Sequence, residues 1–431
     1  MLRLSSKVYF MINMKQGFIL LLLMYSCAAM HAQLTIDECQ TKARENYPLI
    51  KRYDLIKKSQ EYTLSNAGKA HLPQFALIAK ASYQSDVTSV PISIPGINIP
   101  TLSKDQYNAY IDVSQSLWDG GTISAQKKIA NSNAEVEQQQ INVDLYAIQE
   151  RVNQLFFGIL LFNAQLNQNQ IMQDELQRNF VTILNYIENG IANQADLDAI
   201  KVEQLKTKQN RIQIESNKKA YTDMLSYMIG EPLNDNIIFI KPNADNILVS
   251  NTINRPELQL FESQNKLFES QKSMIKSSYM PKINLFLQGG VGRPALNMLN
   301  PDFDTYYIGG VRLTWNFGAL YTQKNDVRKL EINQNNIATQ KETFLYNTNL
   351  KITLENQEIK RLKDLMTDDD EIISLRENIK KSAQAKVANG MMTVIELMRE
   401  VSSEDLAKQA KITHEIELLM AIYNLKNTTN L

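Results

Sequence analysis

Histidine and cysteine are both scarce in this chain of 431 residues, with 3 and 2 copies respectively. These side chains supply many protein metal ligands, and also many of the general bases and nucleophiles of enzymes. The composition therefore offers poor material for a metal centre or for acid–base catalysis. We expect no cofactor, no metal site and no enzymatic activity.

Glycine and proline are scarce as well. The chain contains 15 Gly and 11 Pro, roughly half of their usual frequencies. Both residues mark turns and end regular elements. Their low number predicts a small set of long helices and strands joined by few connections.

Long hydrophobic runs are missing, apart from one short segment near the N-terminus. Residues 17–25 (GFILLLLMY) are apolar and follow Lys7 and Lys15. A helix needs about 20 apolar residues to span a bilayer, whereas the core of a signal peptide is shorter. We expect residues 1–32 to be a signal peptide, with Met14 as an alternative start, and no transmembrane helix after it.

The two cysteines have different expected fates. Cys27 falls in the predicted leader, so Cys39 is left without a partner for an intrachain disulfide. The segment Met24-Tyr25-Ser26-Cys27 also loosely matches a lipid-attachment motif. Cys27 is therefore either a leader residue or, as the less favoured alternative, a lipidated one.

The charge of the chain is balanced. It has 46 Lys and Arg and 46 Asp and Glu, and residues 1–32 contain three of the cations and no acid. The mature chain therefore has 43 minus 46 charges, or −3. A nucleic-acid binder would show a basic footprint, so no nucleic-acid partner is expected.

The sequence contains two related halves. Pro48 and Pro73 are followed 208 residues later by Pro256 and Pro281, and the segment 190–197 is followed 200 residues later by 390–397. The difference of 8 residues falls between two predicted strands, where a loop tolerates an insertion. We interpret the chain as a first repeat at 33–230, a linker at 231–254 and a second repeat at 255–431.

Each repeat has the same predicted order of elements: helix, strand, strand, long helix and shorter helix. The predicted helices that open the repeats span residues 35–71 and 256–280. Alternation of apolar and polar residues predicts strands at 74–84, 106–118, 282–292 and 306–317. Helical hairpins are predicted at 122–230 and 322–427.

The predicted strands have two interpretations. They could be ordinary half-buried strands, which are common. However, they are about 10 to 12 residues long, with Tyr or Trp near their ends, as in strands of membrane barrels. The loops that join them, 85–104 and 293–304, are long and polar or rich in proline, which favours the membrane interpretation.

The long helices carry a heptad pattern. Residues 122–187 contain one Gly and no Pro. Apolar residues step by four and three along this stretch, which predicts a packed helical seam. The seam consists of Ile141, Leu145, Ile148, Val152, Leu155, Ile159, Phe162 and Leu166.

These features together resemble the TolC-like family of outer-membrane efflux proteins, over essentially the whole mature chain. The segments that carry the resemblance are Leu34-Thr35-Ile36-Asp37-Glu38-Cys39, Asn46-Tyr47-Pro48, Leu72-Pro73, Leu117-Trp118-Asp119-Gly120-Gly121, Arg255-Pro256-Glu257-Leu258, Tyr279-Met280-Pro281 and the two hairpins at Gly190 and Gly390. One departure is Trp315-Asn316-Phe317-Gly318-Ala319, which lacks the Asp-Gly-Gly of the first repeat.

The resemblance implies a mainly α fold in a homotrimer. Each chain would contribute four strands to a shared 12-stranded transmembrane β-barrel in outer-membrane lipid, and long helices to a periplasmic α-barrel. The implied function is the exit duct of a tripartite efflux or type I secretion system in a Gram-negative bacterium. Implied partners are a periplasmic adaptor and an inner-membrane transporter of the RND or ABC type. The alternative is a soluble periplasmic coiled-coil adaptor or scaffold.

The hairpin tips are the expected functional site. Asp196 and Glu396 each lie six residues after a hairpin glycine, so they should stand at equivalent heights. Together with Arg399, which replaces a second acid often found in the family, they would form a pore constriction. The tips around Gly190 and Gly390 would contact the adaptor. The competing interpretation is solvated surface carboxylates, with Glu396 paired to Arg399.

Two further interpretations concern chemistry. His71 and His414 have no acidic or nucleophilic neighbours at useful sequence spacing, so both are expected to be surface or terminal helix residues. Met391 and Met392 at a tip could bind a soft metal such as copper. Flexible apolar packing or an adaptor contact is the favoured interpretation.

Overall fold

The computed structural model describes residues 33–89, 91, 96, 101–190, 192–234, 237–243 and 252–430. The predicted signal peptide at 1–32, including Cys27, lies outside the described residues, as does part of the linker at 231–254. Within the described ranges, no helix is both long enough and apolar enough to cross a membrane.

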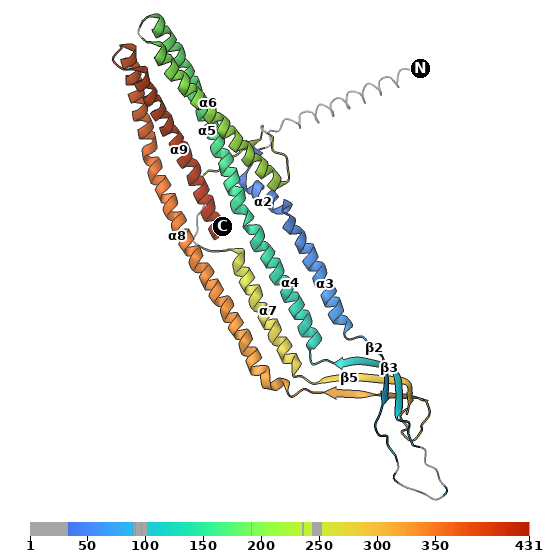
Figure 1. Cartoon of the computed structure of the whole chain (residues 1–431). Helices are drawn as coiled ribbons and strands as arrows, with labels where there is room; N and C mark the ends of the chain where they lie inside the picture. The colour runs from blue at the N-terminus through green and yellow to red at the C-terminus, as the bar shows by residue number, and fades with distance from the viewer. Residues whose placement is uncertain are drawn as a thin grey trace, which may run out of the picture. The chain divides into compact units, whose positions relative to one another are not determined.

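The predicted mainly helical fold with two similar halves is confirmed (Figure 1). The helices are α2 (Ile36–Asn46), α3 (Arg52–Lys69), α4 (Thr122–Tyr146), α5 (Ile148–Glu188), α6 (Gln194–Ile229), α7 (Pro256–Ser278), α8 (Ala319–Ala388) and α9 (Val394–Thr429). The strands are β1 (Gln33–Leu34), β2 (Gln74–Tyr83), β3 (Asp105–Trp118), β4 (Ile238–Phe239), β5 (Lys282–Arg293) and β6 (Asp304–Thr314).

The prediction of one continuous helix over residues 35–71 is wrong. Residues 35–71 form α2, a 3-10 turn at Pro48–Lys51 and α3. Proline has no backbone N–H and disfavours the helical conformation of the residue before it. In agreement with this, Tyr47 has an extended backbone with ψ of 128°.

Other boundaries also differ from the predictions. The first long helix is interrupted at Ala147, between α4 and α5, whereas α8 is continuous over 70 residues. The last strand of the sheet ends at Thr314 rather than at 317. Beyond its end, the Trp315 indole Nε1 donates to the Tyr279 carbonyl at 3.0 Å. The short strands β1 and β4, which pair in parallel, were not predicted.

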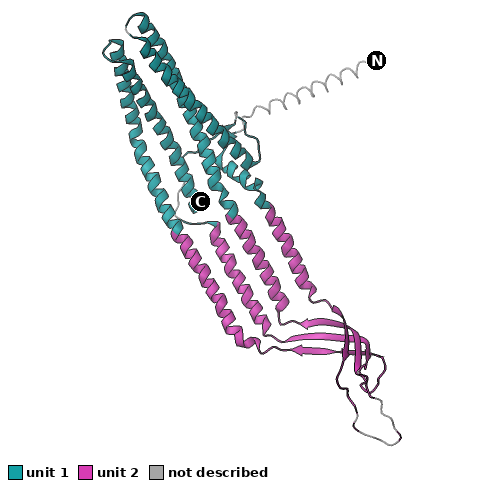
Figure 2. Ribbon diagram, viewed as in Figure 1, with its two compact units in different colours: residues 1–50, 144–255, 347–431 teal, residues 51–143, 256–346 magenta. Residues whose placement is uncertain are grey.

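The chain divides into two compact units (Figure 2). Unit 1 contains residues 1–50, 144–255 and 347–431, and unit 2 contains 51–143 and 256–346. Each unit takes segments from both predicted repeats. The units therefore do not coincide with the repeats.

Unit 2 contains a four-stranded antiparallel sheet in the order β2-β3-β5-β6. Strands β2 and β3 come from the first repeat and β5 and β6 from the second, so the β3–β5 junction joins the repeats. At this junction Val113 pairs with Leu287 and Asp112 with Gln288. Within the part of the chain that the structure describes, the outer strands β2 and β6 each pair with one neighbouring strand.

The sheet has one apolar and one polar face, because successive side chains of a strand point to opposite sides. Its apolar face is open, with Leu77 78% and Val311 64% exposed. The other members of this face include Phe75, Tyr83, Ile111, Val113, Leu285, Leu287, Val291, Tyr307 and Leu313. On the opposite face Gln288 donates to Asp112 at 2.8 Å, and the Tyr306 hydroxyl donates to Asn108 at 2.8 Å.

Unit 1 is helical and has two main apolar clusters. One joins α2, α5, α6 and α9, and includes Phe156, Phe157 and the buried Cys39. Burial raises the pKa of the Cys39 thiol to about 12, so this cysteine is an unreactive core residue. The second cluster lies toward the hairpin turns and is described with them.

Candidate functional site at the hairpin tips

The two helical hairpins end in turns of the same construction. Gly190 and Gly390 adopt left-handed backbone conformations, with φ of 74° and 68°. Their N–H groups donate to the Ile187 and Val387 carbonyls, both at 3.0 Å. Glycine is favoured at this position because it has no Cβ to clash in the left-handed region.

Each return helix begins with a capping box. In the first hairpin, the Asn193 N–H donates to Asp196 Oδ2 at 3.0 Å, and the Asp196 N–H donates to Asn193 Oδ1 at 3.2 Å. In the second, Thr393 N–H donates to Glu396 Oε2 at 3.0 Å, and Glu396 N–H donates to Thr393 Oγ1 at 3.3 Å. The two carboxylates thus satisfy helix N-termini, a role that was not predicted.

The signal for this role was present in the sequence. Asn193 and Asp196 are three residues apart, as are Thr393 and Glu396, and this spacing marks the start of a helix. A carboxylate in the first turn also interacts favourably with the positive end of the helix dipole. The tip acids therefore have a structural role whether or not they also face a pore.

The structure brings both tip acids to one pocket. Asp196 and Glu396 line a hollow of about 370 Å³, together with Tyr186, Met391 and Met392. Arg399 does not line this hollow, and its exposed side chain lies one turn further along α9. Among the described residues no ion pair within 4.0 Å joins Arg399 to Glu396, although the charge of Arg399 acts on this carboxylate.

Glu396 remains ionised at neutral pH. The Thr393 N–H and the Thr393 hydroxyl hold the pKa of this carboxyl below its ordinary value, and the charge of Arg399 adds a smaller effect in the same direction. The second hairpin tip therefore carries a permanent negative charge at neutral pH.

Below the turns, an apolar cluster holds four helices together. Its buried members are Met172, Leu176, Ile183, Leu197, Ile200, Ala383, Val387, Val394, Leu397, Met398 and Val401, and Met392 packs against it. Met391, by contrast, is 71% exposed. The two adjacent methionines thus have different surroundings.

A cluster of ion pairs connects three helices next to this apolar packing. Lys380 Nζ of α8 lies 2.8 Å from Glu175 Oε1 of α5 and 2.5 Å from Glu404 Oε2 of α9. Lys408 Nζ lies 2.5 Å from Glu404 Oε1 and 3.1 Å from Glu377 Oε1. Burial favours the neutral form of Glu404, but the ammonium groups of Lys380 and Lys408 outweigh it and lower the pKa of its carboxyl.

Beside this cluster lies Asp405, whose hydrogen-bond partners among the described residues are two side-chain amides. Its carboxylate accepts hydrogen bonds from Gln168 Nε2 at 2.7 Å and Gln409 Nε2 at 2.6 Å. Burial raises the pKa of Asp405 more than these amides lower it. Burial therefore disfavours the ionised form of Asp405, whereas the charge of the neighbouring Glu404 is compensated by Lys380 and Lys408.

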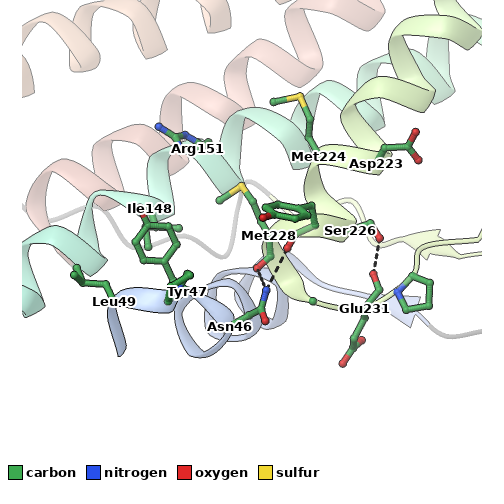
Figure 3. A pocket seen from close by; sticks show the side chains of 14 residues that line it. Asn46, Tyr47, Leu49, Ile148, Arg151, Asp223, Met224, Ser226, Met228 and Glu231 are labelled. Atoms are coloured by element: carbon green, nitrogen blue, oxygen red, sulfur yellow. Dashed lines mark hydrogen bonds between the residues drawn. The ribbon is translucent and has the colours of Figure 1, made fainter. Parts of the chain in front are cut away.

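A second hollow lies away from the tips, in the part of unit 1 where α2 meets the end of α6 (Figure 3). This groove of about 1230 Å³ has Tyr47, Ile148 and Met224 among its lining residues. Asn46 Nδ2 donates to the Tyr227 and Met228 carbonyls at 3.2 and 3.1 Å. These bonds satisfy two carbonyl groups at the C-terminal end of α6.

Within the described residues, no group of three or more His, Cys, Asp or Glu side chains could hold a metal ion. The structure does bring an acidic side chain to His414: its Nδ1 lies 2.9 Å from Asp369 Oδ2 of α8. Sequence spacing could not reveal this pair because its members lie on different helices.

Comparisons with known proteins agree with this architecture. The sequence pattern of the family described as outer membrane efflux protein matches residues 41–231. Among curated proteins, no sequence matches the chain.

Solved structures match over most of the chain. CusC, a protein described as forming a transmembrane channel, has a TM-score of 0.67 and 13% identity, with 91% of each chain covered. The outer membrane protein VceC from Vibrio cholerae has a TM-score of 0.62 and 12% identity, covering 90% of this chain and 95% of VceC.

The CmeC outer membrane channel from Campylobacter jejuni has a TM-score of 0.64 and 13% identity, covering 91% of this chain and 85% of CmeC. At such low identity these likenesses concern the fold. The chain is thus similar in sequence to the outer membrane efflux protein family over residues 41–231, and similar in fold to solved outer-membrane channels over most of its length.

Proposed function

We propose that this protein is a subunit of the outer-membrane exit duct of a tripartite efflux or type I secretion system. The duct is passive, and it carries substrates from the periplasmic side through the outer membrane. The observation that carries this proposal is the sheet in unit 2, whose apolar face is open while its polar face is hydrogen-bonded. Lipid covers such a face, and the polar face then lines a water-filled passage.

Strand length supports a membrane role for this sheet. Strands β2, β3, β5 and β6 contain 10, 14, 12 and 11 residues. A tilted membrane strand needs about 9–11 residues to cross the hydrocarbon layer. Each strand is therefore long enough to span the bilayer.

A single chain cannot close such a barrel. The smallest membrane barrels have about eight strands, whereas this sheet has four. In the proposed homotrimer, three copies supply twelve strands, each chain contributing one third of the wall.

The helices of unit 1 support the same assembly. Within one chain α5 of the first repeat packs against α9 of the second. In a closed ring of repeats, α8 must then pack against α6 of the next copy. Both helices have exposed apolar side chains in the single chain, among them Ile372 of α8, which is 46% exposed, and Leu205 of α6, which is 59% exposed.

The proposed gate lies at the hairpin tips. Three copies would place Asp196 and Glu396 around one narrow opening, and such rings of carboxylates favour cations. Arg399 would adjust the charge next to this ring. Opening requires the tips to separate, and the ion pairs of Lys380 and Lys408 restrain the helices that would move.

The tips are also the proposed docking site for the periplasmic adaptor. The turns at Gly190 and Gly390 end both hairpins, and the exposed Met391 offers an apolar contact there. An inner-membrane pump of the RND or ABC type would supply the energy, because the sequence contains no phosphate-binding loop for a nucleotide. No nucleic acid takes part in this function.

The alternative, a soluble coiled-coil adaptor or scaffold, is not favoured. It accounts for the helical hairpins. It leaves the open apolar face of the sheet in water, although contiguous apolar surface of this size normally marks an interaction site.

Membrane extraction tests the proposal directly. Membranes from expressing cells are washed with high salt and with alkaline carbonate, then dissolved in a mild detergent and sized. We expect the protein to resist both washes, to need detergent and to elute as a trimer that conducts ions in planar bilayers. Release by carbonate as a monomer would identify the soluble alternative.

A further inference from the structure

The four-stranded sheet ends in two unsatisfied edges, and the repeat determines how they meet. Strands β2 and β6 each have one side without a partner strand among the described residues. Long exposed strand edges with an apolar face are templates for pairing with another chain. The inference below rests on the proposed trimeric duct and names the residues that pair between its copies.

The two hairpins of the sheet are equivalent residue by residue. Gln74 pairs with Ser114 in the first hairpin, and Lys282 with Thr314 in the second. Adding 208 to the β2 number and 200 to the β3 number converts one pair into the other. These offsets are the same as those between the prolines and between the hairpin glycines in the sequence.

The β3–β5 junction therefore provides the pattern for the missing junction. There Ile111 pairs with Gly289 and Val113 with Leu287. Applying the same offsets moves β3 onto β6 and β5 onto β2. We propose that β6 of one copy pairs antiparallel with β2 of the next, with Val311 opposite Ala81 and Leu313 opposite Ala79.

Three features of the sheet agree with this junction. Four strands that alternate in direction leave β2 and β6 antiparallel when copies are joined. All proposed pairs join residues of the same face, so the apolar face stays continuous from copy to copy. Side-chain sizes are complementary, because the same register sets Gly309 opposite Tyr83.

The register also has one unfavourable pair. It sets Arg312 opposite Lys80 on the polar face, at the position where Gln288 and Asp112 hydrogen-bond within one chain. Like charges directly opposite each other weaken strand pairing. In the structure the Arg312 guanidinium lies over the Phe286 ring, 4.8 Å from its centroid, which draws this charge toward its own neighbouring strand.

Cysteine pairs test the register. In a Cys39→Ala background, the double variants Ala81→Cys/Val311→Cys and Ala79→Cys/Leu313→Cys are oxidised in membranes and run on non-reducing gels. Within one chain β2 and β6 are three strand spacings apart, about 14 Å. A disulfide needs Cα atoms within about 7 Å, so any link joins two copies.

Mismatched pairs provide the control. Ala81→Cys/Leu313→Cys and Ala79→Cys/Val311→Cys place the thiols diagonally across the junction, about 7–8 Å apart. We expect the matched pairs to give about tenfold more linked dimers and trimers than the mismatched pairs. Single-cysteine variants identify links that arise from random collision.

The outcomes separate this inference from the proposed function. Linking of mismatched pairs alone, or of none of the four pairs in a protein that still sizes as a trimer, overturns the register and leaves the duct in place. A protein that sizes as a carbonate-soluble monomer overturns both.

Discussion

Asn193 and Asp196 exchange two hydrogen bonds at the start of α6, and Thr393 and Glu396 repeat the exchange 200 residues later. The proposed gate acids are thus also the acids that hold the tip geometry. Charge and capping must be separated by experiment, because an alanine at either position removes both.

The first prediction separates these two roles. Asp196→Asn/Glu396→Gln removes the charge and keeps an oxygen acceptor for the N–H groups of Asn193 and Thr393. If the acids line the pore, this variant should weaken block by divalent cations in bilayer recordings. Asp196→Ala/Glu396→Ala should do the same and also increase the conductance.

The matched control is Asn193→Ala/Thr393→Ala, which removes capping side chains and leaves both charges. It should lower stability by about 0.5–2 kcal/mol for each cap and leave the divalent block unchanged. Wild-type block in the Asn/Gln variant would mean that these acids act only as caps.

The second prediction concerns Lys380. Lys380→Met leaves Glu175 without its ammonium partner and Glu404 with Lys408 alone. We expect a loss of about 1–3 kcal/mol of stability, measured by thermal unfolding of the detergent-solubilised protein. The control Lys329→Met breaks an exposed pair with Asp326, and should change stability by less than about 0.5 kcal/mol. Equal effects of the two variants would contradict a restraining role for the Lys380 cluster.

The third prediction is a dependence of stability on pH. Because the pKa of Glu404 is lowered in the folded protein, its contribution is present above its ordinary pKa of 4.5 and is lost as the pH falls through the folded value. The free energy of unfolding of Glu404→Gln should therefore fall less steeply on acidification than that of the wild type.

Asp405 should act in the opposite direction. Its raised pKa means that the charged form destabilises the fold at neutral pH, and that protonation on acidification relieves this cost. Asp405→Asn should increase stability at pH 7 and have a smaller effect near pH 3. An increase of the same size at both pH values would contradict this explanation.

The fourth prediction compares two glycines. Gly390→Ala should cost about 1–2 kcal/mol because of its left-handed backbone, and an added Cβ would meet no atom within 4 Å. Gly230→Ala has the same strain, and its Cβ would also lie 2.6 Å from Asn46 Oδ1. It should cost at least about 1 kcal/mol more, again by thermal unfolding. Gly390→Asn is the milder control, since asparagine tolerates this conformation.

The fifth prediction uses the like charges of the proposed junction. Lys80→Glu would place an acid opposite Arg312 of the next copy, so the trimer should resist dissociation by heat in dodecyl sulfate better than the wild type. Lys80→Glu/Arg312→Glu restores like charges and should remove the gain. If the single variant dissociates at or below the wild-type temperature, Lys80 and Arg312 do not face each other.

Repetition made much of the fold predictable. The offsets of 208 and 200, read from prolines and glycines, also relate the registers of the two strand hairpins. Alternating side chains located β2, β3, β5 and β6 because one face of each strand is apolar. The hairpin turns were predicted because glycine, here Gly190 and Gly390, is the residue most favoured at the left-handed position that ends a helix.

Features that depend on contacts between distant segments could not be predicted. Three helices that pack side by side bring together Lys380, Glu175 and Glu404. The spacing of these residues in the sequence does not predict this contact. The pair of His414 and Asp369 has the same origin. The break at Pro48 could have been predicted, because proline disfavours a helical conformation of the residue before it. The spacing of Asn193 and Asp196 could likewise have predicted a helix cap.

The identical registers of the two strand hairpins have a consequence for the symmetry of the proposed trimer. A chain with one half alone would need six copies to build the same wall, with six equal seams. Fusion of the halves makes three of those seams covalent neighbours and leaves three between separate molecules. The two kinds of seam can then differ in sequence. The seam inside the chain contains the hydrogen-bonded Asp112 and Gln288, whereas the outer strands have the cationic Lys80 and Arg312 at the equivalent positions.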